Sequence, residues 1–169
     1  NMLTTVNLTI PDGVTSITRN SIWGDFGNSS TQFNVYIPDS VSSIGDSAFS
    51  ALRLTSVTIP DSVTSIGSYA FSNNRLTSVM IPDSVTSIGS SAFSYNQLTS
   101  LTIPYSVSAG DDPFLFNMLT TVNLTIPDGV TSITRNSIWS KVGNLSTQFN
   151  FNIPDSVTSI GDGAFRGLR

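Results

Sequence analysis

Aspartate is the residue type in this sequence that could most readily do chemistry, either as a general base or as a ligand for a cation. All 11 acidic residues of the 169-residue chain are aspartates, because the sequence contains no Glu. It also contains no His and no Cys, so the usual general bases, thiolate nucleophiles and ligands of transition metals are missing. One adjacent pair of carboxylates, Asp111-Asp112, lies between Gly110 and Pro113 and predicts a turn. We therefore expect no enzyme, no catalytic residue and no cofactor.

A second group of aspartates, Asp39, Asp61 and Asp83, recurs at an interval of 22 residues directly after Ile-Pro. In neighbouring strands such residues would form a ladder about 4.8 Å apart, and a Ca²⁺ ion could relieve their repulsion. Alternatively, each aspartate bonds the amides of its own turn. We favour the second arrangement and expect no metal site, because Ca²⁺ takes six to eight oxygen ligands and Tyr105 interrupts the series.

The elements that must position these residues are set by one repeated tripeptide, Ile-Pro-Asp or a near variant. A fixed period in the twenties is typical of a solenoid, in which each coil buries its apolar face against its neighbours. We therefore predict a solenoid of about seven coils, each 22–27 residues long. The anchor isoleucines of these coils are Ile10, Ile37, Ile59, Ile81, Ile103, Ile126 and Ile153.

The coil around Ile59 illustrates the structure expected within each period. Val57 and Ile59 alternate with polar residues, which predicts a strand of a parallel ladder, and Pro60 ends it. Residues 63–66 predict a second, shorter strand, and Ala70-Phe71 predicts a turn of α-helix or 3₁₀-helix with Phe71 in the core. The position of Phe71 is filled in other coils by Phe49, Phe93 and Phe165, and by Ile22 and Ile138.

A longer repeat lies over the first. Residues 1–52 return at 117–168 with few substitutions, so that five coils form a super-repeat of 116 residues. We predict one continuous array over 1–169, made of a unit at 1–116 and a partial second copy at 117–169. Because the pattern starts and stops within a unit, we expect the chain to be a segment of a longer protein.

The segment from Leu54 to Phe71, Leu-Thr-Ser-Val-Thr-Ile-Pro-Asp-Ser-Val-Thr-Ser-Ile-Gly-Ser-Tyr-Ala-Phe, resembles the BspA-like class of leucine-rich repeat, with its pattern LxxLxIPxxVxxIGxxAF. The resemblance covers the whole chain, most clearly in the coils of Ile37, Ile59, Ile81 and Ile153. It implies a non-enzymatic protein that is extracellular or at the cell surface, often an adhesin-like binder of proteins or other cells. It provides no catalytic residues.

The outward side of the main strands is the predicted binding face, because repeat proteins commonly bind partners on the strand surface. Its residues lie one and three positions before each anchor isoleucine and are uncharged, with Tyr36 and Met80 the side chains best suited to contact. A merely solvated sheet is the alternative. The predicted face consists of Asn7, Thr9, Asn34, Tyr36, Ser56, Thr58, Ser78, Met80, Ser100, Thr102, Asn123, Thr125, Asn150 and Asn152.

Four Asn-x-Ser/Thr sequences, at Asn7, Asn28, Asn123 and Asn144, are acceptors for N-glycosylation in a glycosylating pathway. Sugars at Asn7 or Asn123 would block a broad partner on the predicted face. The alternatives are a carbohydrate-coated rod and the chance occurrence of such sequences in a chain rich in Asn, Ser and Thr.

The charge balance narrows the choice of partner. The formal net charge is −4, with seven basic residues that form no cluster, so we expect no binding to nucleic acid. No apolar run is long enough for membrane insertion. The expected partners are proteins or glycans on other cells or matrix. A structural filament, formed by tandem units or by end-to-end self-association, is the alternative, and ice binding by rows of Thr such as Thr64 and Thr86 is a third, weaker one.

Overall fold

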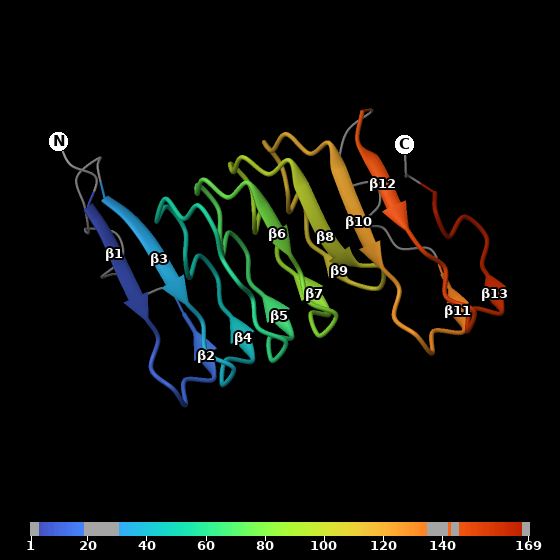
Figure 1. The fold of residues 1–169 in the computed structure, drawn as a ribbon, viewed down its shortest axis with the longest axis horizontal. Helices are drawn as coiled ribbons and strands as arrows, with labels where there is room; N and C mark the ends of the chain where they lie inside the picture. Colours follow the sequence, from blue (N-terminus) through green and yellow to red (C-terminus); the bar gives the residue numbers. More distant parts are fainter. Residues whose placement is uncertain (1–3, 19–30, 135–141, 143–145, 167–169) are drawn as a thin grey trace.

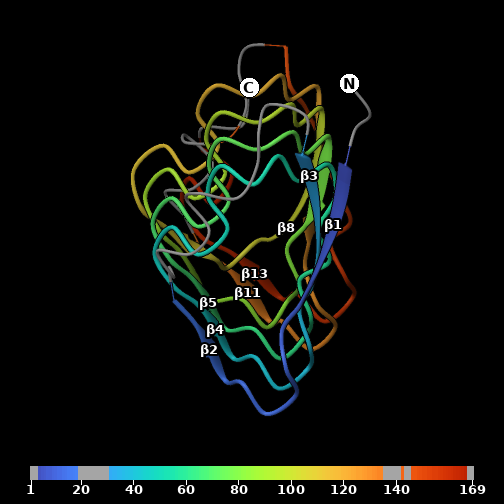
Figure 2. The same cartoon turned by 90° about the vertical axis from the view of Figure 1, so that its left-hand side faces the viewer.

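In the computed structural model, the described part of the chain, residues 4–18, 31–134, 142 and 146–166, forms a stack of coils that advances from one end to the other along the sequence. The first described strand, β1 (Thr4–Thr9), and the last, β13 (Ser159–Ile160), lie at opposite ends of the stack (Figure 1). Longer strands form one side of the coils and two-residue strands form another (Figure 2). The longer strands are β1 (Thr4–Thr9), β3 (Thr31–Tyr36), β6 (Ser78–Met80), β8 (Ser100–Pro104), β10 (Thr121–Thr125) and β12 (Gln148–Phe151). The short strands are β2 (Ser16–Ile17), β4 (Ser43–Ile44), β5 (Ser65–Ile66), β7 (Ser87–Ile88), β9 (Ser108–Ala109), β11 (Ser132–Ile133) and β13 (Ser159–Ile160).

Every pairing between described strands is parallel and joins one coil to the next. Ile44 pairs with Ile66 and Ile66 pairs with Ile88, so like residues stack on like. Each coil thereby buries an apolar face that it could not bury alone. The prediction of a leucine-rich-repeat solenoid with a parallel strand ladder and a second short strand in each coil is confirmed.

A column of phenylalanine rings fills the centre of the array. Phe49, Phe71, Phe93 and Phe114 stack on one another with ring centroids 5.1–5.4 Å apart. Three of them are almost completely buried, and Phe114 is 4% exposed. The prediction that Phe71 lies in the core is confirmed, and Phe114 adds a member to the column that the sequence pattern did not reveal. The predicted equivalents Ile22 and Ile138 lie outside the described residues.

The predicted helical turn at Ala70-Phe71 is wrong: these residues form turns, and the described part of the chain has no helix. Tyr69, one residue earlier, has a φ of 58°, which a right-handed helix cannot contain. Alternate N–H groups of this segment donate to the next coil, as in Tyr69 N to Ser90 O (3.0 Å) and Phe71 N to Ala92 O (2.7 Å), while Ala70 N donates to Gly67 O within its own coil (3.4 Å). Pairing between coils therefore replaces a helix on the third side.

The strand predicted around Val57 and Ile59 is also absent, because residues 54–60 form no strand and pair with neither β3 nor β6. The ladder of longer strands is thus interrupted at the Ile59 coil, while the short ladder continues through it from β4 to β5. Further along the chain the short ladder is interrupted and the ladder of longer strands continues. There β8 pairs with β10, but β9 and β11 belong to different sheets.

Both interruptions lie between coils that bury residues at different distances from the anchor isoleucine. Before Ile37 the buried residue Phe33 lies four positions ahead of the anchor, whereas before Ile59 the buried Leu54 lies five positions ahead and Thr55 is exposed. At that one position the side chains of the two segments point to opposite sides, although Val35 and Val57, each two residues before its anchor, are both half-buried. Between β8 and β10 the strands slide until Leu101 pairs with Val122. At the Ile59 coil the short ladder fixes Ser43 opposite Ser65, and the longer strands separate instead.

Glycine is required where the short ladder turns into the third side. A Cβ added at Gly67 would lie 2.5 Å from the backbone nitrogen of Asp46 and 2.6 Å from the carbonyl carbon of Gly45. In the final described coil the equivalent Gly161 has more room, since its Cβ would lie 3.5 Å from the Ile133 oxygen. The close approach of successive coils therefore limits this position to glycine in the middle of the array.

We expect Gly67→Ala to lower the free energy of unfolding by about 2 kcal/mol, because the added methyl group meets backbone atoms that cannot move without separating two coils. Urea unfolding followed by circular dichroism measures the effect. Gly161→Ala is the matched control and should stay within about 0.5 kcal/mol of the parent. Equal losses for the two variants would contradict the packing argument.

Candidate binding face

The longer strands turn the predicted binding face outward, as the alternation in the sequence indicates. In β6, Val79 is buried between the exposed side chains of Ser78 and Met80, and in β8 the buried Leu101 lies between the half-buried Ser100 and Thr102. None of the residues predicted for this face is buried. We use the term strand face for this set of residues.

Two large side chains project from the strand face. Tyr36, at the end of β3, is 62% exposed, and Met80, at the end of β6, is 68% exposed. Side chains of these types contribute disproportionately to protein interfaces because they offer large contact areas. They lie on either side of the interrupted ladder, with Thr58 of the Ile59 coil between them in sequence.

Paired asparagines occupy the two ends of the strand face. Asn34 donates its side-chain amide to Asn7 Oδ1 at 3.1 Å, and Asn150 donates to Asn123 Oδ1 at the same distance. Such ladders order polar side chains across adjacent strands. The sequons at Asn7 and Asn123 therefore lie within paired strands, on β1 and β10. Those at Asn28 and Asn144 lie outside the described residues, and glycosylation stays a prediction.

The aspartates that follow the anchors do not bond their own turn amides, which corrects the arrangement favoured from the sequence. In the Ile59 coil the turn is closed by Val63 N donating to Pro60 O at 3.0 Å. Ser62 Oγ then donates to Val41 O of the preceding coil at 2.7 Å. Among the described residues, none donates a hydrogen bond to the Asp61 carboxylate. The aspartate is therefore not needed to close the turn, and its side chain is exposed.

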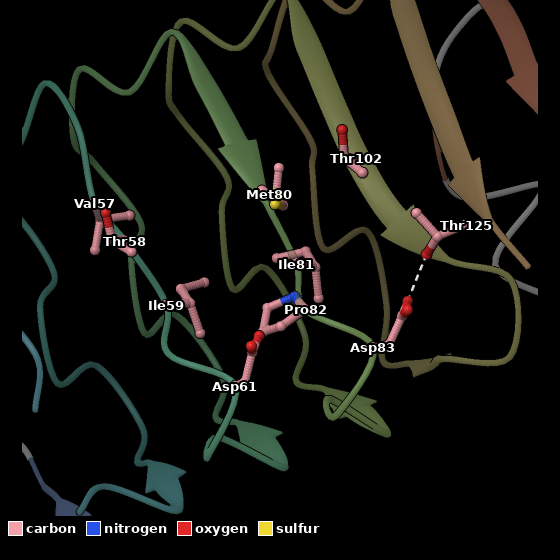
Figure 3. A pocket seen from close by; sticks show the side chains of 10 residues that line it. All are labelled: Val57, Thr58, Ile59, Asp61, Met80, Ile81, Pro82, Asp83, Thr102 and Thr125. Carbon is pink, nitrogen blue, oxygen red and sulfur yellow. Dashed lines mark hydrogen bonds between the residues drawn. The ribbon is translucent and has the colours of Figure 1, made fainter. Parts of the chain in front are cut away.

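Asp83 instead accepts a hydrogen bond from a coil two positions further along. The hydroxyl of Thr125 donates to Asp83 Oδ1 at 2.6 Å (Figure 3). This contact passes over the Ile103 coil, in which Tyr105 takes the place of the aspartate. A polar bridge thus spans the strand face near the ends of β8 and β10.

A groove of about 460 Å³ opens on the strand face beside the interrupted ladder (Figure 3). Such a volume lies within the roughly 300–1,000 Å³ of ligand pockets. The sequence gives no signal for it, since it arises where residues 54–60 of the Ile59 coil form no strand beside β6. Its walls are formed by Val57, Thr58, Ile59, Asp61, Met80, Ile81, Pro82, Asp83, Thr102 and Thr125.

The adjacent pair Asp111-Asp112 forms part of an exposed turn. Ser91 N donates to Asp111 O at 2.9 Å, and Leu115 N donates to Asp112 O at 3.2 Å. Both side chains are exposed. Within the described ranges, no group of three or more potential ligands lies close enough to hold a metal ion. In the same ranges, no helix is long and apolar enough to cross a membrane.

Two buried asparagines, Asn74 and Asn96, and the half-buried Asn117 were missed by the sequence analysis. Each lies at the start of the segment that leads to the next strand, and its amide group bonds the backbone of two coils. Their spacing of about one coil length was the signal that could have revealed them. They hold in place the segments that carry the strand face.

Comparison with known proteins identifies the same repeat and the same fold. The model for the BspA type leucine rich repeat region matches residues 23–146 and 143–169, in six copies. A leucine-rich repeat protein from Eubacterium ventriosum ATCC 27560 is 22% identical and has a TM-score of 0.59, with coverage of 96% of this chain and 51% of that chain. The pneumococcal vaccine antigen PcpA is 16% identical with a TM-score of 0.55, and the match covers 96% of this chain and 53% of that chain.

This chain therefore spans about half the length of the solved structures that it matches. No curated protein matches it. The likeness to the solved structures shows the fold, and the family model extends over nearly the whole sequence. From its repeats and its coils alike, the chain belongs to the family of proteins with BspA type leucine-rich repeats.

Proposed function

We propose that this chain is a non-enzymatic binding module of an extracellular or cell-surface protein, and that it holds protein or glycan partners on its strand face. The observation that carries the proposal is the outward row of uncharged side chains on the longer strands from β1 to β12 and on the strandless Ile59 coil between β3 and β6, none of them buried. A repeat array presents such a row as one extended surface, which suits a long or repetitive partner.

The chemistry of the strand face supports contact rather than catalysis. Hydroxyl and amide groups can exchange hydrogen bonds with a glycan or a peptide without a large cost of removing charge from water. Tyr36 and Met80 add exposed contact area at the middle of the face. PcpA, which shares the fold, is a vaccine antigen, and this agrees with the surface location that forms part of the proposal.

A structural filament is the second candidate, and one observation favours it. β10 and β12 pair Asn123 with Asn150 in the same register in which β1 and β3 pair Asn7 with Asn34. Units of 116 residues can therefore follow one another with the same geometry, whether in one chain or end to end. Sedimentation separates the candidates, because elongation with concentration supports the filament and a constant monomer supports the binding module.

On any test surface that retains the parent chain, changing both Tyr36 and Met80 to Ser should lower retention of the chain about tenfold. This corresponds to ~1.4 kcal/mol of binding free energy. The reason is the loss of the two largest exposed contacts on the strand face. Retention is measured with beads that carry the chain, on collagen, mucin glycoprotein and a microarray of neutral oligosaccharides. Each single variant is measured as well.

Tyr69→Ser is the matched control, since Tyr69 is 51% exposed but lies on the third side of the coil. It should retain the partner as the parent does, and thermal unfolding should be the same for all variants. If the double variant is retained as well as the parent, or if Tyr69→Ser lowers retention equally, partners do not use the strand face.

A further inference from the structure

We propose that the groove beside the Ile59 coil binds an extended peptide segment that carries a basic side chain, such as a Lys- or Arg-containing strand of a partner protein. This inference rests on the proposed binding function and specifies where on the strand face one class of partner lies. It is drawn from three features of the groove: its backbone edges, its carboxylates and its apolar floor.

The backbone edges come from the interrupted ladder. β6 pairs with β8 on one side, and on its other side the Ile59 coil provides no strand. β3 likewise pairs only with β1. An internal sheet edge of this kind presents N–H and C=O groups that an extended peptide can pair with, as in recognition by strand addition. Elsewhere in the described ladder, β8 and β10 have strands on both sides and offer no such edge.

The carboxylates give the groove its charge. Asp61 and Asp83 come from successive coils and both line it, and no Lys or Arg is among the lining residues. Asp83 accepts a hydrogen bond from Thr125 at 2.6 Å, which fixes one carboxylate at the mouth of the groove. Two carboxylates without a cationic partner favour a cationic ligand, and a basic side chain is the cation that a peptide provides.

The apolar residues form the remainder of the wall. Ile59 and Ile81 lie at the base of the groove but are core residues, 6% and 1% exposed, so the accessible apolar surface comes from Met80 and the half-buried Val57. Met80 extends this surface outward, whereas Pro82 is buried (Figure 3). Methionine adapts its shape to different ligands, and apolar stems of Lys or Arg pack well on such a surface while their charged ends meet carboxylates.

A neutral glycan fits these observations less well than a basic peptide. Its hydroxyl groups could bond Asp61, Thr58 or Thr102, but it has no regular row of N–H and C=O groups to match the edge of β6 and no positive charge to match the aspartates. The lining also lacks an aromatic ring on which a sugar could stack. The open backbone edge and the charge therefore select the peptide.

The test uses the whole chain and a fluorescein-labelled, blocked hexapeptide, Thr-Lys-Val-Lys-Thr-Lys, in a fluorescence polarisation titration. The variant Asp61→Asn/Asp83→Asn should bind it at least tenfold more weakly than the parent. Asp39→Asn is the matched control, because Asp39 has the same place in its coil, is exposed, and does not line the groove. It should bind as the parent does. Binding should also weaken as the ionic strength rises from about 0.02 to 0.5 M, because salt screens exposed charges.

Several outcomes would overturn the proposal. They are the absence of peptide binding, equal binding of a peptide with Glu in place of each Lys, an equal loss with Asp39→Asn, and competition by blocked single lysine as effective as that by the hexapeptide. If the parent binds N-acetylglucosamine tetramer, and Asp61→Asn/Asp83→Asn weakens this binding while Asp39→Asn does not, the groove would be assigned to glycans instead. Retention that depends on Tyr36 but not on Asp61 or Asp83 would leave the strand face intact as a binding surface and reject the groove alone.

Discussion

Replacing Phe71 by alanine is expected to lower the free energy of unfolding by about 4 kcal/mol, the middle of the range for a buried phenylalanine. The ring is completely buried and stacks on Phe49 at 5.3 Å and on Phe93 at 5.1 Å. Its removal leaves a cavity between two other rings, which are held by their own coils and cannot close it. Urea unfolding monitored by circular dichroism gives the value.

Two further substitutions separate cavity formation from the loss of an aromatic ring. Phe71→Leu keeps most of the apolar volume and should cost about 1.5 kcal/mol. Phe165→Ala removes a half-buried ring whose described stacking partner is Phe151 alone, at 4.9 Å, and should cost less than Phe71→Ala. If Phe165→Ala proved as destabilising as Phe71→Ala, the central column would not be the part of the core that the array depends on.

The fold could be predicted because its main features repeat in the sequence. The anchor isoleucines fix the coil length, and the position shared by Phe49, Phe71 and Phe93 fixes a core column. In a regular solenoid each residue contacts its own equivalents, so the period predicts the register of the short ladder, whereas between β8 and β10 the register shifts and Ile103 pairs with Leu124. Ser43 opposite Ser65 and Ser65 opposite Ser87 follow directly.

The third side could not be predicted in the same way. Ala70-Phe71 favours a helix by composition, yet a left-handed residue recurs just before it, at Ser47, Tyr69 and Ser91, with φ between 54° and 58°. None of these three residues is a glycine, and the sequence carries a sign of positive φ at the equivalent Gly163 of the last coil, whose φ is 65°. The hydrogen bonds that each coil makes to the next stabilise a backbone that local propensity alone would not choose.

The candidate site was only half predictable for a related reason. The outward row of the strand face follows from alternation, which is a local property. The groove does not follow from the local sequence. Thr-Ser-Val-Thr-Ile, which ends at Ile59, and Thr-Ser-Leu-Thr-Ile, which ends at Ile103, are nearly the same, yet only the second contains a strand. One neighbour also differs, because the Ile59 coil follows β3, whose buried Phe33 lies four residues before its anchor where Leu54 lies five before. Toward β6 the pattern is the same, with Leu76 five residues before Ile81, and it does not explain the missing pairing.

Asn96 joins the two coils that border the groove, so its loss should affect both stability and the site. Its Oδ1 accepts from Leu76 N at 3.0 Å, and its Nδ2 donates to Phe71 O at 2.9 Å and to Phe93 O at 3.0 Å. The side chain is 8% exposed, so water cannot replace these partners if the amide is removed. Each backbone group left unsatisfied costs about 1–3 kcal/mol.

We therefore expect Asn96→Leu, which has a similar volume, to lower the free energy of unfolding by about 3 kcal/mol. Leucine supplies neither the acceptor for Leu76 nor the donors for the two phenylalanine carbonyls. Hydrogen exchange should show the loss first at the amide of Leu76, because local opening exposes the groups whose bonds are missing.

Gln97→Leu, at an exposed position beside Asn96, is the control and should change the free energy of unfolding by about 0.5 kcal/mol at most. A value for Asn96→Leu as small as that of the control would mean that the buried amide does not hold successive coils together.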